Sequence, residues 1–239
     1  MTSKERVLTA VAHETPDRIP IDFGGHRSSG IAAIAYAKLK QALGITSGDI
    51  YVYDMIQQLA IVEPDVLDAV GADTIELGRG FCLEERDWKP WRLPDGTPCK
   101  VPAFINLEER GGDTYLLSDD GIDLGVQKAG CLYFEQVYWP WLDRDIASQD
   151  FSDLEDALAH NMWTAIPAPG GHIPLDDEGL KQLADGARKL RATTDRAIIG
   201  LFGGNLFEVP TFLYRIDTYL MHMGLESDAC ARLSSVLCD

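Results

Sequence analysis

The sequence has few basic residues and no long apolar run, and these two absences limit what the protein can bind. Among its 239 residues, 38 are acidic and 21 are basic, so the formal net charge is −17 at pH 7. Such an acidic surface repels nucleic-acid phosphates and anionic lipid headgroups, and we expect neither nucleic acid nor a membrane as a partner. No run approaches the roughly 18 apolar residues of a membrane span, and charged side chains interrupt the N-terminus where a signal peptide has its apolar core. We therefore expect a cytoplasmic protein.

Cysteine pairs and nucleotide-binding motifs are also missing. The five cysteines are scattered and form no Cys-x-x-Cys pair, so we expect reduced, mostly buried thiols rather than zinc ligands. The sequence contains no Gly-Lys-Ser/Thr of a phosphate-binding loop, and the glycines of residues 200–204 lack the spacing of a dinucleotide fingerprint. The residues themselves therefore predict neither a metal site nor a nucleotide site.

Helical and strand patterns alternate along the chain, with one β-rich stretch in the middle. Helices are expected over residues 3–12, 31–43, 55–62, 64–70, 143–160, 176–192, 208–223 and 226–238, and strands over residues 19–23, 73–77 and 197–202. Between residues 84 and 140, turn signals such as Pro94-Asp95-Gly96 and Asp119-Asp120-Gly121 alternate with short strand-like stretches. This spacing predicts an antiparallel β-meander inserted into the rest. The strand–helix–strand rhythm elsewhere favours an α/β fold with a parallel sheet.

Four expected strands end on polar residues, three of them beside glycines. These ends are Asp22-Phe23-Gly24-Gly25-His26-Arg27, Tyr53-Asp54, Glu76-Leu77-Gly78-Arg79 and Phe202-Gly203-Gly204-Asn205. The carboxyl ends of parallel strands in a barrel open onto one mouth, and glycine lets a ligand approach the backbone. The four ends are therefore predicted to line one pocket.

Three carboxylates in these segments are candidate catalytic acids or bases: Asp22, Asp54 and Glu76. A barrel mouth desolvates a carboxylate and raises its pKa, which suits proton transfer. Asp54 fits equally well as the cap of the helix expected after it. Glu76 lies within an apolar strand and must be paired or neutral, and Arg79 is its candidate partner in either a catalytic or a structural pair.

The remaining candidates are expected to bind substrate. Arg27 and His26 would hold a carboxylate or phosphate, Arg27 through a two-point fork, unless they form an ordinary solvated loop. The other predicted substrate-binding residues are Tyr53, Arg79, Gly203, Gly204 and Asn205. The aromatic cluster Tyr133, Phe134, Tyr138, Trp139 and Trp141 either lines a pocket for a flat ligand or packs the insertion onto the rest of the protein.

Three stretches of the sequence resemble the uroporphyrinogen decarboxylase superfamily, which includes the corrinoid-dependent methyltransferases. They are Arg6-Val7-Leu8 through Pro16-Asp17-Arg18-Ile19-Pro20, Leu67 through Gly71-Ala72-Asp73, and Ile198-Ile199-Gly200. The resemblance implies a TIM-type (β/α)8 barrel with its active cleft at the C-terminal mouth. Only about half of the eight strands are recognised, so we expect residues 1–239 to form one partial barrel domain with residues 84–140 inserted. A half-barrel exposes apolar edges, which the missing half or a homo-oligomer would cover.

The sequence departs from both branches of the superfamily. The resemblance implies two arginines after the first strand of the decarboxylase and an aspartate after the second, where this sequence has Arg27 alone and Leu77-Gly78-Arg79. The methyltransferase branch holds zinc through His-x-Cys and a later cysteine, and His222-Met223-Gly224 lacks that cysteine. No cofactor is therefore expected within this chain, whereas zinc and a corrinoid are expected if a missing C-terminal half is supplied.

The functional hypothesis that follows is methyl transfer of the corrinoid-dependent type. The methyl group would move between a small donor and a corrinoid or thiol, with a corrinoid protein as partner. One alternative is a carboxy-lyase of the uroporphyrinogen decarboxylase type, which acts on a tetrapyrrole in heme biosynthesis. The other is an inactive barrel fragment that binds a ligand or a partner without turnover.

Overall fold

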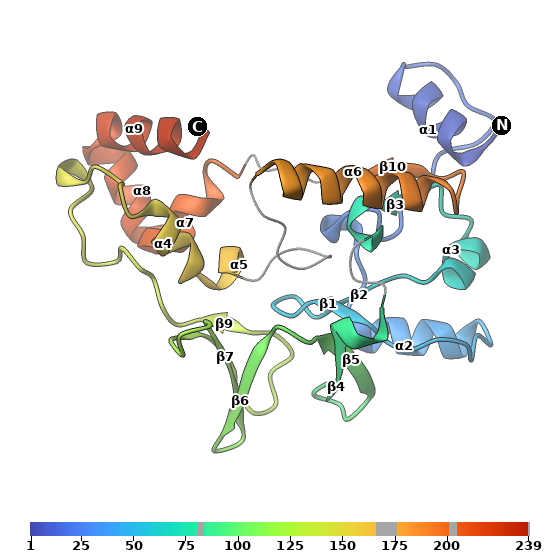
Figure 1. The fold of residues 1–239 in the computed structure, drawn as a ribbon, viewed down its shortest axis with the longest axis horizontal. Helices are drawn as coiled ribbons and strands as arrows, with labels where there is room; N and C mark the ends of the chain where they lie inside the picture. The colour runs from blue at the N-terminus through green and yellow to red at the C-terminus, as the bar shows by residue number, and fades with distance from the viewer. Residues whose placement is uncertain (81–83, 166–175, 201–204, 239) are drawn as a thin grey trace. The chain divides into compact units, whose positions relative to one another are not determined.

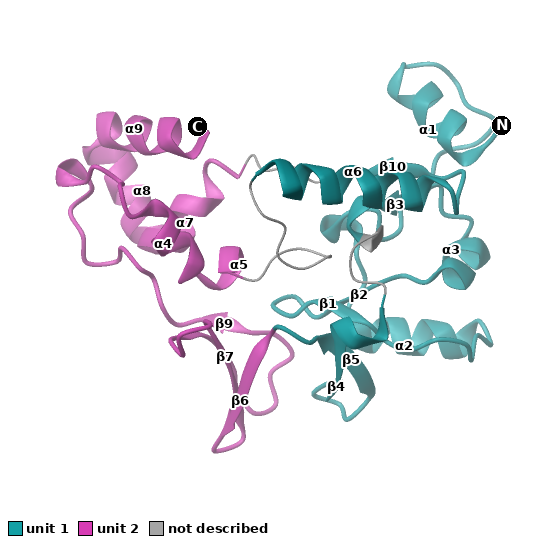
Figure 2. Cartoon of the chain, viewed as in Figure 1, with its two compact units in different colours: residues 1–104, 168–201 teal, residues 105–167, 202–239 magenta. Residues whose placement is uncertain are grey.

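The computed structural model describes residues 1–80, 84–165, 176–200 and 205–238 (Figure 1). The chain divides into two compact units (Figure 2). Unit 1 comprises residues 1–104 and 168–201, and unit 2 comprises residues 105–167 and 202–239. No described helix has both the length and the apolarity needed to cross a lipid bilayer.

The helices of unit 1 begin and end at the signals that their sequence carries. In α1 (Ser3–Val11), the Thr2 hydroxyl accepts from the Glu5 amide at 3.2 Å and the Glu5 carboxylate accepts from the Thr2 amide at 2.8 Å, a complete capping box. The helix α3 (Pro64–Val70) starts on a proline and ends at Gly71, whose φ is +68°. The other helices of unit 1 are α2 (Ala33–Ala42) and α6 (Asp177–Arg191), with short 3-10 turns η1 (Arg27–Ser29), η2 (Leu77–Gly80) and η3 (Glu85–Asp87). These bounds confirm four of the expected helices.

Unit 1 contains three two-stranded sheets. The strands β3 (Thr74–Glu76) and β10 (Ala197–Ile199) pair in parallel, with Thr74 opposite Ala197 and Glu76 opposite Ile199. The pairs β1 (Val52–Asp54) with β2 (Leu59–Ala60), and β4 (Trp88–Arg92) with β5 (Pro98–Pro102), are antiparallel. The described sheets of the whole chain have two or four strands. The closed barrel remains a prediction.

The expected strand over residues 19–23 is not formed. Ile21 does lie beside the start of β3, because its carbonyl accepts from the Asp73 amide at 2.7 Å. Its own amide, however, donates to the Asp73 carboxylate at 2.8 Å rather than to a backbone carbonyl. A side chain thus takes the place of a backbone acceptor, and a continuous ladder does not develop.

The expected helix over residues 55–62 is wrong, since the chain makes a turn and returns as β2. The Asp54 carboxylate accepts from the Gln57 amide at 2.9 Å, and Gln58 has a φ of +56°. This left-handed residue reverses the chain, so that Ala60 pairs with Val52. The apolar spacing of this stretch therefore belongs to a buried hairpin.

Unit 2 combines a meander with a group of helices. Its antiparallel sheet has the order β6 (Asn106–Arg110), β7 (Asp113–Leu117), β8 (Asp123–Gln127) and β9 (Glu135–Gln136). The antiparallel strands expected over residues 84–140 are thus divided between two sheets, because β4 and β5 pair with each other in unit 1. The helices are α4 (Leu154–Ala159), α5 (Met162–Ala165), α7 (Glu208–Tyr214), α8 (Ile216–Leu225) and α9 (Ser227–Cys238), with the 3-10 turn η4 (Ile146–Ser148). The single helix expected over residues 208–223 is broken at Arg215, whose φ is +67°. The helix expected over residues 143–160 is limited to α4.

The core of unit 2 is built largely from aromatic residues. Trp141 and Tyr214 are fully buried, with ring centroids 5.4 Å apart, and Tyr219 stacks on Tyr214 at 6.5 Å. The aromatic cluster expected near the end of the insertion therefore divides. Trp141 packs into this core, whereas Tyr133 and Tyr138 are exposed.

Candidate functional site

The segment of residues 22–30, here called the site loop, is fixed to the first residue of β3. The Asp22 carboxylate accepts from the Gly25 amide at 3.0 Å and from the Thr74 hydroxyl at 2.5 Å. A side chain at Gly25 would place its Cβ 2.5 Å from the Thr74 hydroxyl oxygen. Glycine is therefore required where the loop crosses β3.

His26 caps the short helical turn that carries Arg27. Its Nδ1 accepts from the Ser28 amide at 3.0 Å, and its carbonyl accepts from the Ser29 amide at 3.0 Å. A neutral imidazole that accepts at Nδ1 carries its proton on Nε2. His26 therefore orients Arg27 and keeps an N–H at its other edge.

The structure brings together Arg27 and Asp54, which come from two of the four predicted strand ends. A terminal guanidinium nitrogen of Arg27 lies 3.6 Å from Oδ2 of Asp54. The same carboxylate accepts from the Gln57 amide at 2.9 Å and from its side-chain amide at 3.1 Å. Asp54 is only 5% exposed, so it caps its turn, as the alternative interpretation proposed, and also anchors the arginine.

One donor of Arg27 is not used by this arrangement. Its Nε is buried and has no hydrogen-bond partner within the described parts of the chain. A buried donor without an acceptor costs about 1–3 kcal/mol, so such donors are normally satisfied. The Nε–H of Arg27 is thus a buried donor that no described residue satisfies.

Two further predicted site residues, Glu76 in β3 and Tyr53 in β1, are buried. Glu76 lies two residues beyond Thr74 in β3, so the two side chains share a face of that strand. Its expected partner Arg79 belongs to η2, but the Arg79 side chain lies outside what the structure describes. Tyr53 packs in an apolar cluster with Leu59 and Trp88.

Of the fourth predicted strand end, the structure describes only Asn205. Gly203 and Gly204 lie outside the described residues. Asn205 belongs to unit 2, where its carbonyl accepts from the Val209 amide at 2.9 Å. The loop, β1 and β3 of unit 1 therefore make up the candidate site.

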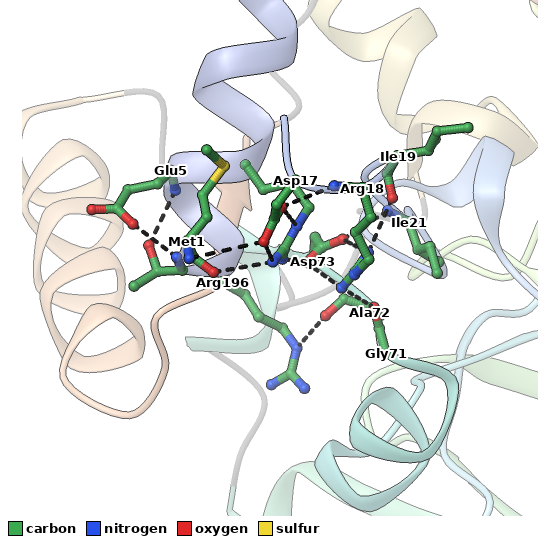
Figure 3. A network of polar contacts seen from close by, with 12 residues as sticks. Met1, Glu5, Asp17, Arg18, Ile19, Ile21, Gly71, Ala72, Asp73 and Arg196 are labelled. Carbon is green, nitrogen blue, oxygen red and sulfur yellow. Dashed lines mark hydrogen bonds and ion pairs between the residues drawn. The ribbon is translucent and has the colours of Figure 1, made fainter. Parts of the chain in front are cut away.

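Sequence reasoning missed a buried ion network centred on Asp73 (Figure 3). The Asp73 carboxylate accepts from Arg6 at 2.6 Å, from Arg18 at 2.6 Å and 2.9 Å, and from the Ile21 amide at 2.8 Å. Burial alone would raise the pKa of Asp73, but the Ile21 amide and the two guanidinium groups outweigh it and lower the pKa to about 2. Asp73 is therefore an anion inside the fold at neutral pH.

This network positions the site loop. Arg6 comes from α1, Arg18 precedes the loop, and Asp73 immediately precedes β3, so the three residues fix residues 1–21 to that strand. Arg196, just before β10, donates to the Ala72 carbonyl at 2.9 Å (Figure 3). The sequence offered one signal that could have drawn attention to this network. Its three charged residues, Arg6, Arg18 and Asp73, all lie in the stretches that resemble the superfamily.

Comparisons of the chain with models of protein families, with curated proteins and with solved structures find no match. Among the described residues, no group of His, Cys, Asp and Glu side chains converges in a way that could hold a metal ion. The ionisable groups that the structure describes in the candidate site include its carboxylates and Arg27. The site offers one unsatisfied N–H donor beside a buried carboxylate.

Proposed function

We propose that Arg27 of the site loop, oriented by Asp54, binds the anionic group of a small organic molecule. The observation that carries the proposal is the buried Nε of Arg27, which has no acceptor among the described residues although the guanidinium lies 3.6 Å from Asp54. A carboxylate or phosphate oxygen would complete the donor set of Arg27 through a charge-assisted hydrogen bond. The Nε2–H of His26 is a second candidate donor in the same loop.

The charge balance of the site supports methyl transfer over tetrapyrrole decarboxylation. Arg27 already faces the carboxylate of Asp54, and Asp22 in the loop and Glu76 on β3 add two more carboxylates. A ligand with many carboxylates would be repelled by this surplus. A small donor with one anionic group is compatible with a single arginine.

We therefore propose a cytoplasmic protein of the uroporphyrinogen decarboxylase superfamily, with a TIM-type barrel, that acts in corrinoid-dependent methyl transfer. This chain would bind the small donor. The described residues do not offer a ligand set for zinc, and we assign no step of the reaction to zinc. The partner that follows from the resemblance is a corrinoid protein.

Equilibrium titrations of the whole chain test this proposal. The probes are benzoate as a monocarboxylate, benzamide as its uncharged counterpart, uroporphyrin as a polycarboxylate, and methylcobalamin followed by its visible absorbance. We expect benzoate to bind more tightly than benzamide, and R27Q to abolish that difference. R86Q is the matched control, because the Arg86 side chain is 79% exposed in the same unit.

The outcomes separate the three functional hypotheses. Methylcobalamin binding together with Arg27-dependent benzoate binding supports methyl transfer. Uroporphyrin binding that exceeds benzoate binding and requires Arg27 would favour the carboxy-lyase instead. A chain that binds none of the probes would contradict the proposed binding site, and binding without turnover would favour the inactive fragment.

A further inference from the structure

Unit 2 contains a hollow on one face of its four-stranded sheet, separate from the site loop of unit 1. Its volume is about 660 Å³, and its lining comes from residues 110–138. Volumes of about 300–1,000 Å³ are typical of sites for small molecules. We call this feature the sheet hollow.

The floor of the sheet hollow is set by strand register. Tyr115 of β7 pairs with Val126 of β8, and Val126 pairs with Glu135 of β9. Residues paired across antiparallel strands point to the same face. Tyr115, Val126 and Glu135 therefore form one row of side chains across the floor of the hollow. Tyr138 forms part of the wall.

The two cations that line the hollow are already neutralised. Arg110 donates to Asp123 at 2.7 Å and to Glu108 at 2.6 Å, and its guanidinium lies 4.6 Å from the centre of the Tyr115 ring. Lys128 donates to Asp113 at 2.9 Å. Neither cation is therefore free to bind an anionic ligand.

Glu135 is the lining charge that lacks a direct partner. The described residues place no hydrogen bond or ion pair on its side chain, although it attracts the Lys128 ammonium at longer range. The lining groups and their pairs comprise two cations, Arg110 and Lys128, and four carboxylates, Glu108, Asp113, Asp123 and Glu135. The local net charge is therefore −2.

We infer that the sheet hollow binds an organic cation with an apolar body, such as an alkylammonium. The faces of tyrosine rings attract cations within about 6 Å. The Arg110 guanidinium already lies over the Tyr115 ring, so the ring offered to a ligand cation is that of Tyr138, together with the Glu135 carboxylate. Val126 and Val137 supply apolar contact for the alkyl groups. The net charge of −17 also concentrates cations near the protein surface.

The test compares choline with 3,3-dimethylbutan-1-ol, which has the same shape but no charge. Titration calorimetry on the whole chain, at one fixed ionic strength, should give saturable binding of choline and weaker binding of the alcohol. E135Q removes the charge at constant shape, and Y138L removes one ring. Each should weaken choline binding by about three- to tenfold while the unfolding temperature stays unchanged.

E155Q is the matched control, because Glu155 is an exposed carboxylate of the same unit in α4. Its affinity for choline should equal that of the wild type. Three results overturn the inference: no saturable binding of choline, equal affinities for choline and the alcohol, or equal losses in E135Q and E155Q.

Discussion

Arg6 donates a 2.6 Å hydrogen bond to the Asp73 carboxylate across 67 positions of sequence. Asp73 has no exposed surface, so its charge depends entirely on protein partners. Two of these partners come from residues before the site loop and one from the backbone of Ile21. The ion network is therefore both a source of stability and the support of the candidate site.

Removal of the Asp73 charge should destabilise unit 1 strongly. D73N keeps the shape but removes the buried anion that Arg6 and Arg18 share, although Arg6 keeps its hydrogen bonds to Asp17. Breaking a buried pair costs about 3–5 kcal/mol. Urea unfolding measures this loss. The control is R188Q, which removes an exposed ion pair with Asp185 on α6 and should have little effect. Equal stabilities of D73N and wild type would contradict the structural role of the network.

The same network should make the stability of the fold depend on pH in the acidic range. The pKa of Asp73 is lowered from the ordinary 3.8 to about 2, and hydrogen bonds from Arg6 lower the pKa of Asp17 to about 2 as well. A lowered pKa stabilises the fold above the unfolded value, and this stabilisation is lost as pH falls from about 4 to about 2. Unfolding temperatures measured across that window should fall steeply for wild type and less steeply for D73N.

A methyl group at Gly25 should disturb the site loop. The added Cβ would lie 2.5 Å from both the Thr74 hydroxyl oxygen and Asp22 Oδ1. We expect G25A to lose about 1–3 kcal/mol of stability through overpacking, and to lose benzoate binding because Arg27 shifts. G224A is the control, since no atom lies within 4 Å of its added Cβ. There, alanine should stabilise α8 by up to about 1 kcal/mol.

The sequence predicted correctly those helices whose first and last residues are fixed by capping residues close to them in the chain. The Thr2–Glu5 capping box, Pro64 and Gly71 are readable in the sequence, and the helices that they delimit are formed. The antiparallel strands of residues 84–140 were likewise predicted from their turns. The hairpin of β1 and β2 was not predicted, and a helix over residues 55–62 was expected in its place. The spacing of apolar residues over so short a stretch does not distinguish a buried turn from a helix.

The candidate site was only partly accessible from sequence. The polar residues at the predicted strand ends included Asp22, Arg27 and Asp54, which the structure places on one loop and one strand. The role of Asp73 was not visible, because a single aspartate carries no pattern that identifies distant arginines as its partners. Contacts across long separations depend on the fold rather than on local spacing.

His160 in unit 2 should make stability depend on pH in the opposite direction. Its Nδ1 lies 2.8 Å from the Asp156 carbonyl and its Nε2 lies 3.1 Å from the Asp120 carboxylate. Both partners only accept, so both ring nitrogens donate only when the imidazole is protonated. Partial burial opposes the charged form, but these hydrogen bonds outweigh it and raise the pKa of His160 above 6.5.

A raised pKa stabilises the fold fully below the unfolded value of 6.5, and this stabilisation is lost as pH rises through the folded value. H160Q should therefore be less stable than wild type at pH ~5.5, by about 0.5–1 kcal/mol, and should approach wild type at pH ~8.5. Paired thermal unfolding curves at the two pH values measure this difference. H13N, which removes an exposed imidazole of unit 1 at a residue with a φ of +60°, is the control. An H160Q deficit that grows with pH would show that the neutral ring, rather than the imidazolium, links α4 to the turn at Asp120.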